Sequence, residues 1–203
     1  MSTVNENIVR EYFESLGFVV SCPCKYVTPG QKKKSEEELD LVVVNPRAKE
    51  HKTPESVIWT TEDLKSVSRG VVAIRGWHTG RFYMSRLEKD SDVLRFAEEG
   101  PYKSACDRLR SSEVAKILCL AELPASQDLK KRTVETLKAK GIDGILVFRT
   151  ILDHLISFVD KKRNYEKSEL LQTIRILKSY DLLRDNQMEL FGKKRRSTRA
   201  KGR

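Results

Sequence analysis

Residues 116–150 contain two short apolar runs separated by one amphipathic segment, and this order constrains the fold more than any other feature. The apolar runs cover Lys116 to Leu123 and Gly144 to Thr150. Such continuous runs are typical of strands that are covered on both faces. The segment between them predicts a helix from Ser126 to Lys140, with an inner stripe of Leu129, Thr133, Val134 and Leu137. We therefore expect two parallel strands joined by a right-handed helical crossover.

The rest of the chain predicts further strands and helices around this unit. Apolar residues at helical spacing predict helices over 4–16, near 102–113, from Thr150 through Val159, and over 168–180. Strands are expected over 18–27, 38–45 and 71–78, with a polar insertion and a short helix at 46–70. This order predicts a layered α/β domain over 1–160, a helical segment over 161–184 and a flexible tail over 185–203.

Composition favours a globular protein in the cytoplasm. Hydrophobic residues make up 39% of the chain and charged residues 33%, and no apolar run approaches the roughly 18 residues that span a bilayer. The start of the chain, Met1 to Glu6, lacks the basic and apolar regions of a signal peptide. Cys119 lies in an apolar run and is expected to be a core thiol. Cys22 and Cys24 share one strand face, but a zinc site needs two further ligands.

Two predicted strands carry ionisable residues that buried strands rarely contain. Asp40 opens the strand 38–45, and Arg75 lies inside the strand 71–78. Period-two alternation puts Asp40 on the face of Val42 and Val44, with Leu39, Leu41 and Val43 on the other face. A carboxylate there is costly unless it is paired, metal-bound or exposed at the strand end. All three interpretations stay open at this point.

These residues resemble the PD-(D/E)xK nuclease superfamily, and the resemblance covers roughly residues 4–150. It implies a restriction-endonuclease-like core of helix, three strands, helix and strand, with a mixed central sheet and flanking helices. It also implies Mg²⁺ as the cofactor, Asp40 as a metal ligand and a helical glutamate at Glu6. The superfamily's Glu-x-Lys in the second strand is matched here by Ala73 and Arg75. Alanine cannot bind metal and arginine is a poor proton shuttle, so we expect a degenerate catalytic site, a pseudo-nuclease.

A relocated carboxylate is the alternative, which would leave an active Mg²⁺-dependent endonuclease or exonuclease. Glu38 is the best candidate because alternation puts it on the strand face of Asp40. Glu6 would complete such a site, or it simply occupies a helix N-terminus that favours carboxylates. Other acidic residues available are Glu36, Glu37, Glu62 and Asp63. Whether the protein is an enzyme stays open.

DNA is the expected anionic partner, because the formal net charge is +10. Seven basic residues between 192 and 203 carry most of that charge, and such a tail either attracts phosphate or only aids solubility. Arg75 is suited to bind a phosphate, and Trp77 to stack a base or pack the core edge. The predicted DNA-binding residues are Arg75, Trp77, His78, Lys193, Lys194, Arg195 and Arg196.

The segment 187–191 resembles the pentapeptide that binds the bacterial sliding clamp. Its Gln187, Met188, Leu190 and Phe191 match the four key residue types. The archaeal and eukaryotic version requires a second aromatic where Gly192 stands, which favours the bacterial clamp. Leu190 and Phe191 would then be exposed anchors in a tail that buries nothing else. The alternative is that both side chains fold back onto the domain.

The hypothesis is a DNA-binding protein of DNA repair or replication, with a nuclease-like domain, that is recruited to the sliding clamp. The second possibility is the active Mg²⁺-dependent nuclease described above. A third is a non-enzymatic adaptor that binds nucleic acid or protein, for which we expect an exposed Asp40 and a structurally paired Arg75.

Overall fold

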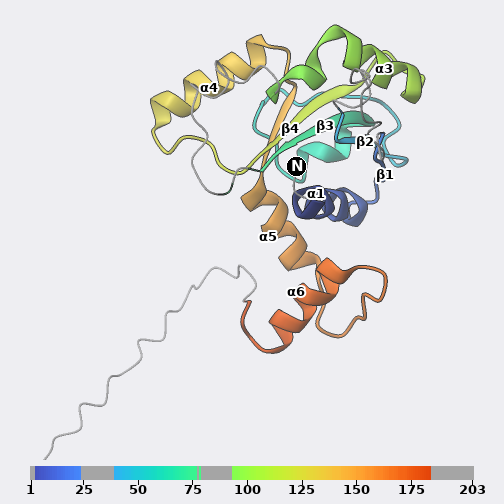
Figure 1. The fold of residues 1–203 in the computed structure, drawn as a ribbon, viewed down its shortest axis with the longest axis vertical. Coiled ribbons are helices and arrows are strands. Elements are labelled where there is room, and N and C mark those ends of the chain that lie inside the picture. Colours follow the sequence, from blue (N-terminus) through green and yellow to red (C-terminus); the bar gives the residue numbers. More distant parts are fainter. Residues whose placement is uncertain (1–2, 24–38, 77, 79–92, 184–203) are drawn as a thin grey trace, which may run out of the picture.

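A computed structural model describes residues 3–23, 39–76, 78 and 93–183 of the chain, and these form a mixed α/β structure (Figure 1). The strands are β1 (Val19–Ser21), β2 (Leu41–Val44), β3 (Arg69–Arg75), β4 (Ala115–Leu120) and β5 (Gly144–Val147). The α-helices are α1 (Thr3–Ser15), α3 (Glu99–Leu109), α4 (Gln127–Ala139), α5 (Phe148–Phe158) and α6 (Glu169–Ser179). Short 3₁₀ turns cover Asp63–Ser66 and Arg95–Ala97. The predicted α/β class is therefore confirmed.

The five strands form one sheet in the order β1-β2-β3-β4-β5. The pairs β1–β2 and β2–β3 are antiparallel, whereas β3–β4 and β4–β5 are parallel. Parallel pairing of β4 with β5 through α4 confirms the strand–helix–strand prediction for residues 116–150. In the centre of the sheet every residue of β3 after Arg69 is buried, which explains its continuous apolar sequence.

Helices cover both faces of the sheet, so the core has two halves (Figure 1). One half joins α1, α5 and α6 to residues such as Leu41, Val72 and Ile74. The other half joins α3 and α4 to residues such as Val42 and Ala73. The thiol of Cys119 is fully buried in the first half, as expected.

The helix ends partly differ from prediction. Ser168 caps α6 as expected, since its Oγ accepts a hydrogen bond from the Leu171 N–H at 3.2 Å. Ser126 precedes α4 but makes no such bond. Thr150 does not begin α5, because the chain turns from extended Val147 directly into the helix at Phe148. The predicted inner position of Leu129 is also wrong, since this side chain is 45% exposed.

The segment between β2 and β3 crosses to the far edge of the sheet and returns. Ile58 forms a parallel bridge with Ile145 of β5, and the Trp59 N–H donates to the Ile145 carbonyl at 2.9 Å. The Trp59 ring is buried against Gly144, where a Cβ would collide with it. This predicted insertion is therefore part of the core and protects the open edge of β5.

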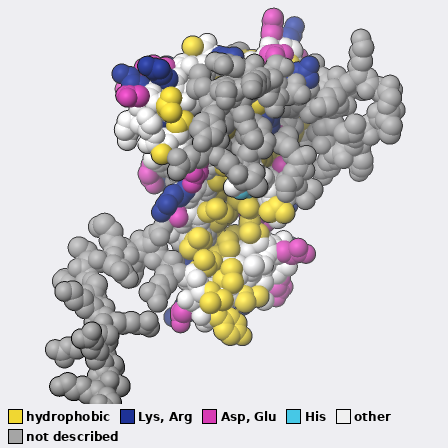
Figure 2. All heavy atoms as spheres, turned by 60° about the vertical axis from the view of Figure 1, so that its left-hand side comes forward, with side chains coloured by type: hydrophobic (Ala, Val, Ile, Leu, Met, Phe, Trp, Pro, Cys, Tyr) yellow, Lys and Arg dark blue, Asp and Glu magenta, His cyan; other side chains and the backbone are white. Residues whose placement is uncertain are grey.

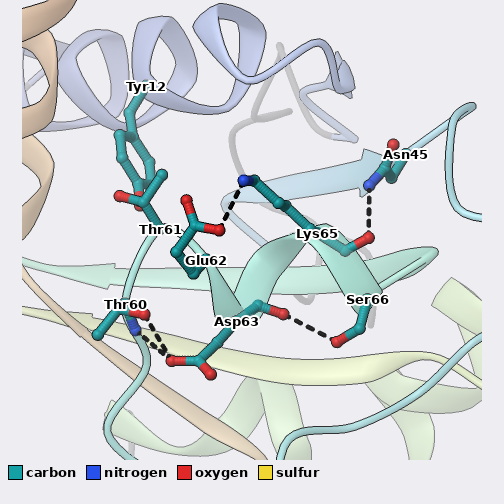
Figure 3. A network of polar contacts seen from close by, with 8 residues as sticks. All are labelled: Tyr12, Asn45, Thr60, Thr61, Glu62, Asp63, Lys65 and Ser66. Atoms are coloured by element: carbon teal, nitrogen blue, oxygen red, sulfur yellow. Dashed lines mark hydrogen bonds and ion pairs between the residues drawn. The ribbon is translucent and has the colours of Figure 1, made fainter.

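A network of polar contacts holds the returning part of this segment (Figure 3). Asp63 accepts hydrogen bonds from the backbone N–H and the hydroxyl of Thr60, at 2.7 and 2.8 Å. Thr61 is hydrogen-bonded to the hydroxyl of Tyr12 in α1 at 3.1 Å. Burial raises the pKa of Tyr12 to about 12, so its phenol stays protonated at neutral pH. The segment is thereby fixed against α1.

The α5–α6 end of the molecule presents hydrophobic side chains to solvent (Figure 2). The exposed large hydrophobic residues of this part are Phe158, Ile176, Tyr180 and Leu182. We call them the α5–α6 apolar face. Among the described helices, none has the length and apolar character needed to cross a membrane.

Candidate functional site

The antiparallel pairing of β2 and β3 brings Asp40 and Arg75 together. Leu41 pairs with Val72, so Asp40, one residue earlier, lies beside the last residues of β3. Val42, Val43 and Val44 then pair along the rest of β3, and their burial fixes this register. The sequence alone predicted both residues for one site, and the structure brings them into direct contact.

The contact is a buried ion pair. Arg75 Nη1 lies 2.7 Å from Asp40 Oδ2, and both side chains are 8% exposed. The same carboxylate oxygen accepts a hydrogen bond from the Ile74 N–H at 2.7 Å. Arg75 Nη1 also donates to the Ile74 carbonyl at 3.0 Å. Asp40 is therefore paired and buried, and the interpretation of an exposed strand-end carboxylate is wrong.

The strand alternation predicted around Asp40 is wrong in one respect. Leu39 packs with Val42 in the half of the core that α3 and α4 cover, whereas Leu41 packs in the other half. Regular alternation would have put Leu39 with Leu41. The backbone bends at Asp40 before β2 begins, and this bend releases Leu39 from the strand pattern.

The position matching the superfamily's glutamate contributes no ligand. Ala73 is fully buried in the core and is paired with Leu118 of β4. Across the described parts of the chain, no three His, Cys, Asp or Glu residues are grouped so that they could hold a metal ion. Glu38 lies outside the described residues. The described residues therefore fit Mg²⁺ poorly, since this ion prefers several oxygen ligands and the one carboxylate of the ion pair already binds a guanidinium.

Glu6, in the first turn of α1, lies near this ion pair. Burial and then the negative charge of Asp40 raise its pKa above the ordinary value of 4.5. The charge of Asp40 therefore acts on Glu6, while a shared metal site for the two carboxylates stays a prediction. A hollow of about 530 Å³ beside Glu6 is lined by residues of α1 and α6 and by Cys22.

The first turn of α1 also holds the chain that follows β3. Asn5 Nδ2 donates to the Gly76 carbonyl at 3.1 Å, and Asn5 Oδ1 lies 3.0 Å from Nε2 of His78. The His78 ring packs edge-to-face on Phe148, with ring centroids 4.7 Å apart. Sequence reasoning missed Asn5, because nothing local marks an asparagine that will meet a residue 73 positions later.

Cys119 is a buried residue of β4 beside the Asp40–Arg75 ion pair. It is paired with Ile74 in the sheet, and burial, together with the charge of Asp40, raises the pKa of its thiol. The thiol is therefore protonated and unsuited to bind metal or act as a nucleophile. Chemically, this end of the sheet holds one neutralised ion pair, one half-buried carboxyl group and one exposed histidine.

The predicted DNA and clamp contacts are only partly described. Arg75 is 7% exposed and His78 is exposed. Trp77, the clamp-like segment 187–191 and the basic tail, including Lys193, Lys194, Arg195 and Arg196, lie outside the described residues. Comparison with known proteins finds no matching family model, and no curated protein or solved structure matches the chain.

Proposed function

We propose that this protein binds DNA through a restriction-endonuclease-like domain whose catalytic site is degenerate, and that segment 187–191 recruits it to the sliding clamp. Two features support the proposal. The described elements α1, β1, β2, β3, α3 and β4 follow one another in the order that the superfamily resemblance implies. The sequence of segment 187–191 matches the clamp-binding pattern at its four key positions.

The observation that carries the proposal is the Asp40–Arg75 ion pair. In a metal-dependent nuclease the carboxylate at this place binds Mg²⁺, which activates water and stabilises the leaving oxygen. Here a guanidinium at 2.7 Å supplies the positive charge instead. Arginine keeps its charge at all accessible pH values and cannot activate water as a metal ion does. The pair therefore stabilises the fold where an active enzyme would hold its metal.

Different parts of the chain would therefore contribute to DNA binding in different ways. Arg75 is paired with Asp40 and is not assigned a contact with DNA. We propose instead that it positions the following residues, Gly76 and His78. The basic tail supplies the sequence-independent attraction to phosphate. The clamp-like segment precedes this tail directly in the chain, so clamp binding would hold the tail close to DNA.

The test combines cleavage, DNA binding and clamp binding on the full chain. Single-stranded, duplex and flapped DNA are incubated with Mg²⁺ or Mn²⁺, beside the isosteric variant Asp40→Asn, with circular dichroism as the check on folding. We expect no cleavage, salt-sensitive DNA binding, and binding to a bacterial sliding clamp that Leu190→Ala with Phe191→Ala abolishes. Deleting residues 192–203 is expected to weaken DNA binding strongly.

The same experiment contains the result that overturns the degenerate site. Metal-dependent cleavage that disappears in Asp40→Asn means that the site has been rebuilt around another acid. Glu38→Gln and Glu6→Gln would then identify that acid. Clamp binding that survives the double replacement of Leu190 and Phe191 would contradict the recruitment part alone.

A protein-binding adaptor is the second candidate, and the α5–α6 apolar face favours it. Tyr180 and Leu182 are 76% and 71% exposed, so an apolar partner surface would find large side chains available there (Figure 2). A chain that neither cleaves nor binds DNA, yet binds a clamp or another protein, would support this candidate over the first.

A further inference from the structure

The sheet has a second candidate binding site, at the opposite end of β3 from the Asp40–Arg75 pair. Arg69 begins β3 and is paired with Val44, the last residue of β2. Arg75 lies six positions after Arg69 along the extended strand, so the two ends lie about 20 Å apart. A cavity of about 480 Å³ opens beside Arg69 and is within the size range of small-molecule pockets.

The walls of this cavity are fixed by hydrogen bonds to the chain after β2. Asn45 is 7% exposed, and its Oδ1 accepts a hydrogen bond from the Arg47 N–H at 3.0 Å. Its own N–H donates to the Ser68 carbonyl at 2.7 Å, and its Nδ2 reaches the Lys65 carbonyl at 3.5 Å (Figure 3). Asn45 and the backbone beside it are therefore positioned before any ligand arrives, which lowers the entropic cost of binding.

The backbone N–H of Ser68 favours one tautomer of a neutral His51 ring. Its Nδ1 lies 3.4 Å from the backbone nitrogen of Ser68, which can only donate, and 3.1 Å from the Ser68 hydroxyl. The neutral ring therefore carries its proton on Nε2. Nε2 lies 3.5 Å from Thr53 Oγ1, a long contact that leaves it a usable donor for a ligand oxygen.

Neither cation of the cavity forms an ion pair within the described part of the chain. Lys49 and the half-buried Arg69 both line it. Among the described residues, no ion pair or hydrogen bond joins either side chain to a carboxylate. A guanidinium cannot lose its charge, and its planar donors match the oxygens of a phosphate. Arg69 with Lys49 and the Nε2 donor of His51 is thus a set suited to a phosphate group.

Glu50 and Glu113 also line the cavity. They disfavour a bare, highly charged anion, but carboxylates accept hydrogen bonds from the amino groups of bases. The combination therefore fits a nucleotide better than an inorganic ion. We propose that this cavity, which we call the Arg69 pocket, binds the phosphate of a nucleotide. This assignment rests on the proposed function, from which we take the nucleotide to be part of a DNA strand. A free nucleotide carries the same phosphate and is the other possible ligand.

The test measures DNA affinity of the full chain by fluorescence anisotropy over a range of salt concentrations. Arg69→Ala and Lys49→Ala are compared with Arg132→Ala and Lys138→Ala, which remove the same charges from exposed positions on α4. We expect each pocket variant to weaken binding about tenfold and to lower the salt slope by about one, because each removes one phosphate contact. The two α4 variants should bind like the wild type.

A second measurement separates the two sources of phosphate. Deoxycytidine 5′-monophosphate is titrated into the full chain while the ring signals of His51 are followed by NMR, with Arg69→Ala as the comparison. Shifts in the wild type that vanish in Arg69→Ala support the pocket even if DNA does not bind, in which case the proposed function fails by itself. Wild-type DNA affinity in both pocket variants, without nucleotide-dependent shifts, overturns the pocket and leaves the proposed function standing.

Discussion

The two ends of β3 each carry an arginine, and their surroundings are opposite. Arg75 lies against a carboxylate, is 7% exposed and contacts the buried end of the sheet. Arg69 lines an open cavity together with His51, Ser68, Glu50 and Glu113, but among the described residues no ion pair joins its side chain to a carboxylate. The structural or ligand-binding role of an arginine thus depends on whether a carboxylate contacts it. A carboxylate in direct contact makes the side chain structural, whereas a guanidinium that contacts no carboxylate stays available for an external anion.

The largest expected difference between the two ends is in stability. Asp40→Ala removes the carboxylate that pairs with the buried guanidinium of Arg75, which should lower the free energy of unfolding by about 3–5 kcal/mol. Arg69→Ala breaks no side-chain ion pair or hydrogen bond among the described residues and should change the free energy of unfolding by no more than about 0.5 kcal/mol. Urea denaturation measures both variants.

A matched double variant shows whether the pair itself is responsible. Asp40→Leu with Arg75→Met replaces both charges by apolar groups of similar length and should recover most of the lost stability. If Asp40→Ala costs less than about 1 kcal/mol, the two ends do not differ in the way described.

The segment between the pocket residues His51 and Ser68 crosses the sheet to β5, and its packing there can be tested. Gly144→Ala puts a methyl group into the ring of Trp59, so the segment must shift, at an expected cost of about 1–3 kcal/mol. Chemical denaturation gives the stability, and the intrinsic fluorescence of the buried indole reports the displacement. Gly100→Ala, at an exposed helical position in α3, is the control and should be neutral or slightly stabilising.

A smaller effect is expected at the wall of the pocket. Asn45→Ala removes the acceptor of the Arg47 N–H and should cost about 1 kcal/mol of unfolding free energy. Because the same side chain holds the start of the loop at Arg47, two residues before Lys49, nucleotide binding should weaken as well. An Asn45→Ala protein that is destabilised but binds nucleotide like the wild type would show that the loop orders itself without this contact.

The sequence predicted the end of β3 that carries Arg75, here called the paired end, better than the end that carries Arg69, here called the open end. The strand pattern and the superfamily resemblance marked Asp40, Arg75 and Glu6, and the structure brings Asp40 and Arg75 into contact. The face of Leu39 was wrong because a bend at Asp40 interrupts the alternation on which the prediction rested.

The open end gave no comparable sequence signal. Arg69 was expected inside a polar insertion, yet it is the first residue of β3. Its neighbours His51 and Ser68 are 17 positions apart in the sequence. Their side chains come within hydrogen-bonding distance because the segment between them runs to the edge of β5 and back. Non-local contacts of this kind leave no periodic trace in the sequence, whereas buried strands do.

The smallest expected effect tests how closely Glu6 approaches the paired end. Its pKa is raised by burial and by Asp40, so the charged form is disfavoured in the folded protein. Glu6→Gln should therefore stabilise the fold slightly at pH 7, by about 0.5 kcal/mol or less, because water screens a half-exposed group. The gain should shrink as pH falls through the raised pKa and vanish below about 4.5, where the wild-type carboxyl group is protonated in both states.

A double-mutant cycle assigns the cause of that small gain. In an Asp40→Asn background the repulsive charge is gone, so Glu6→Gln should stabilise less than it does in the wild type. Unfolding curves at pH 7 for the four proteins measure the coupling. A gain that is equal in both backgrounds would mean that burial alone raises the pKa of Glu6. The charge of the ion pair would then not act on α1.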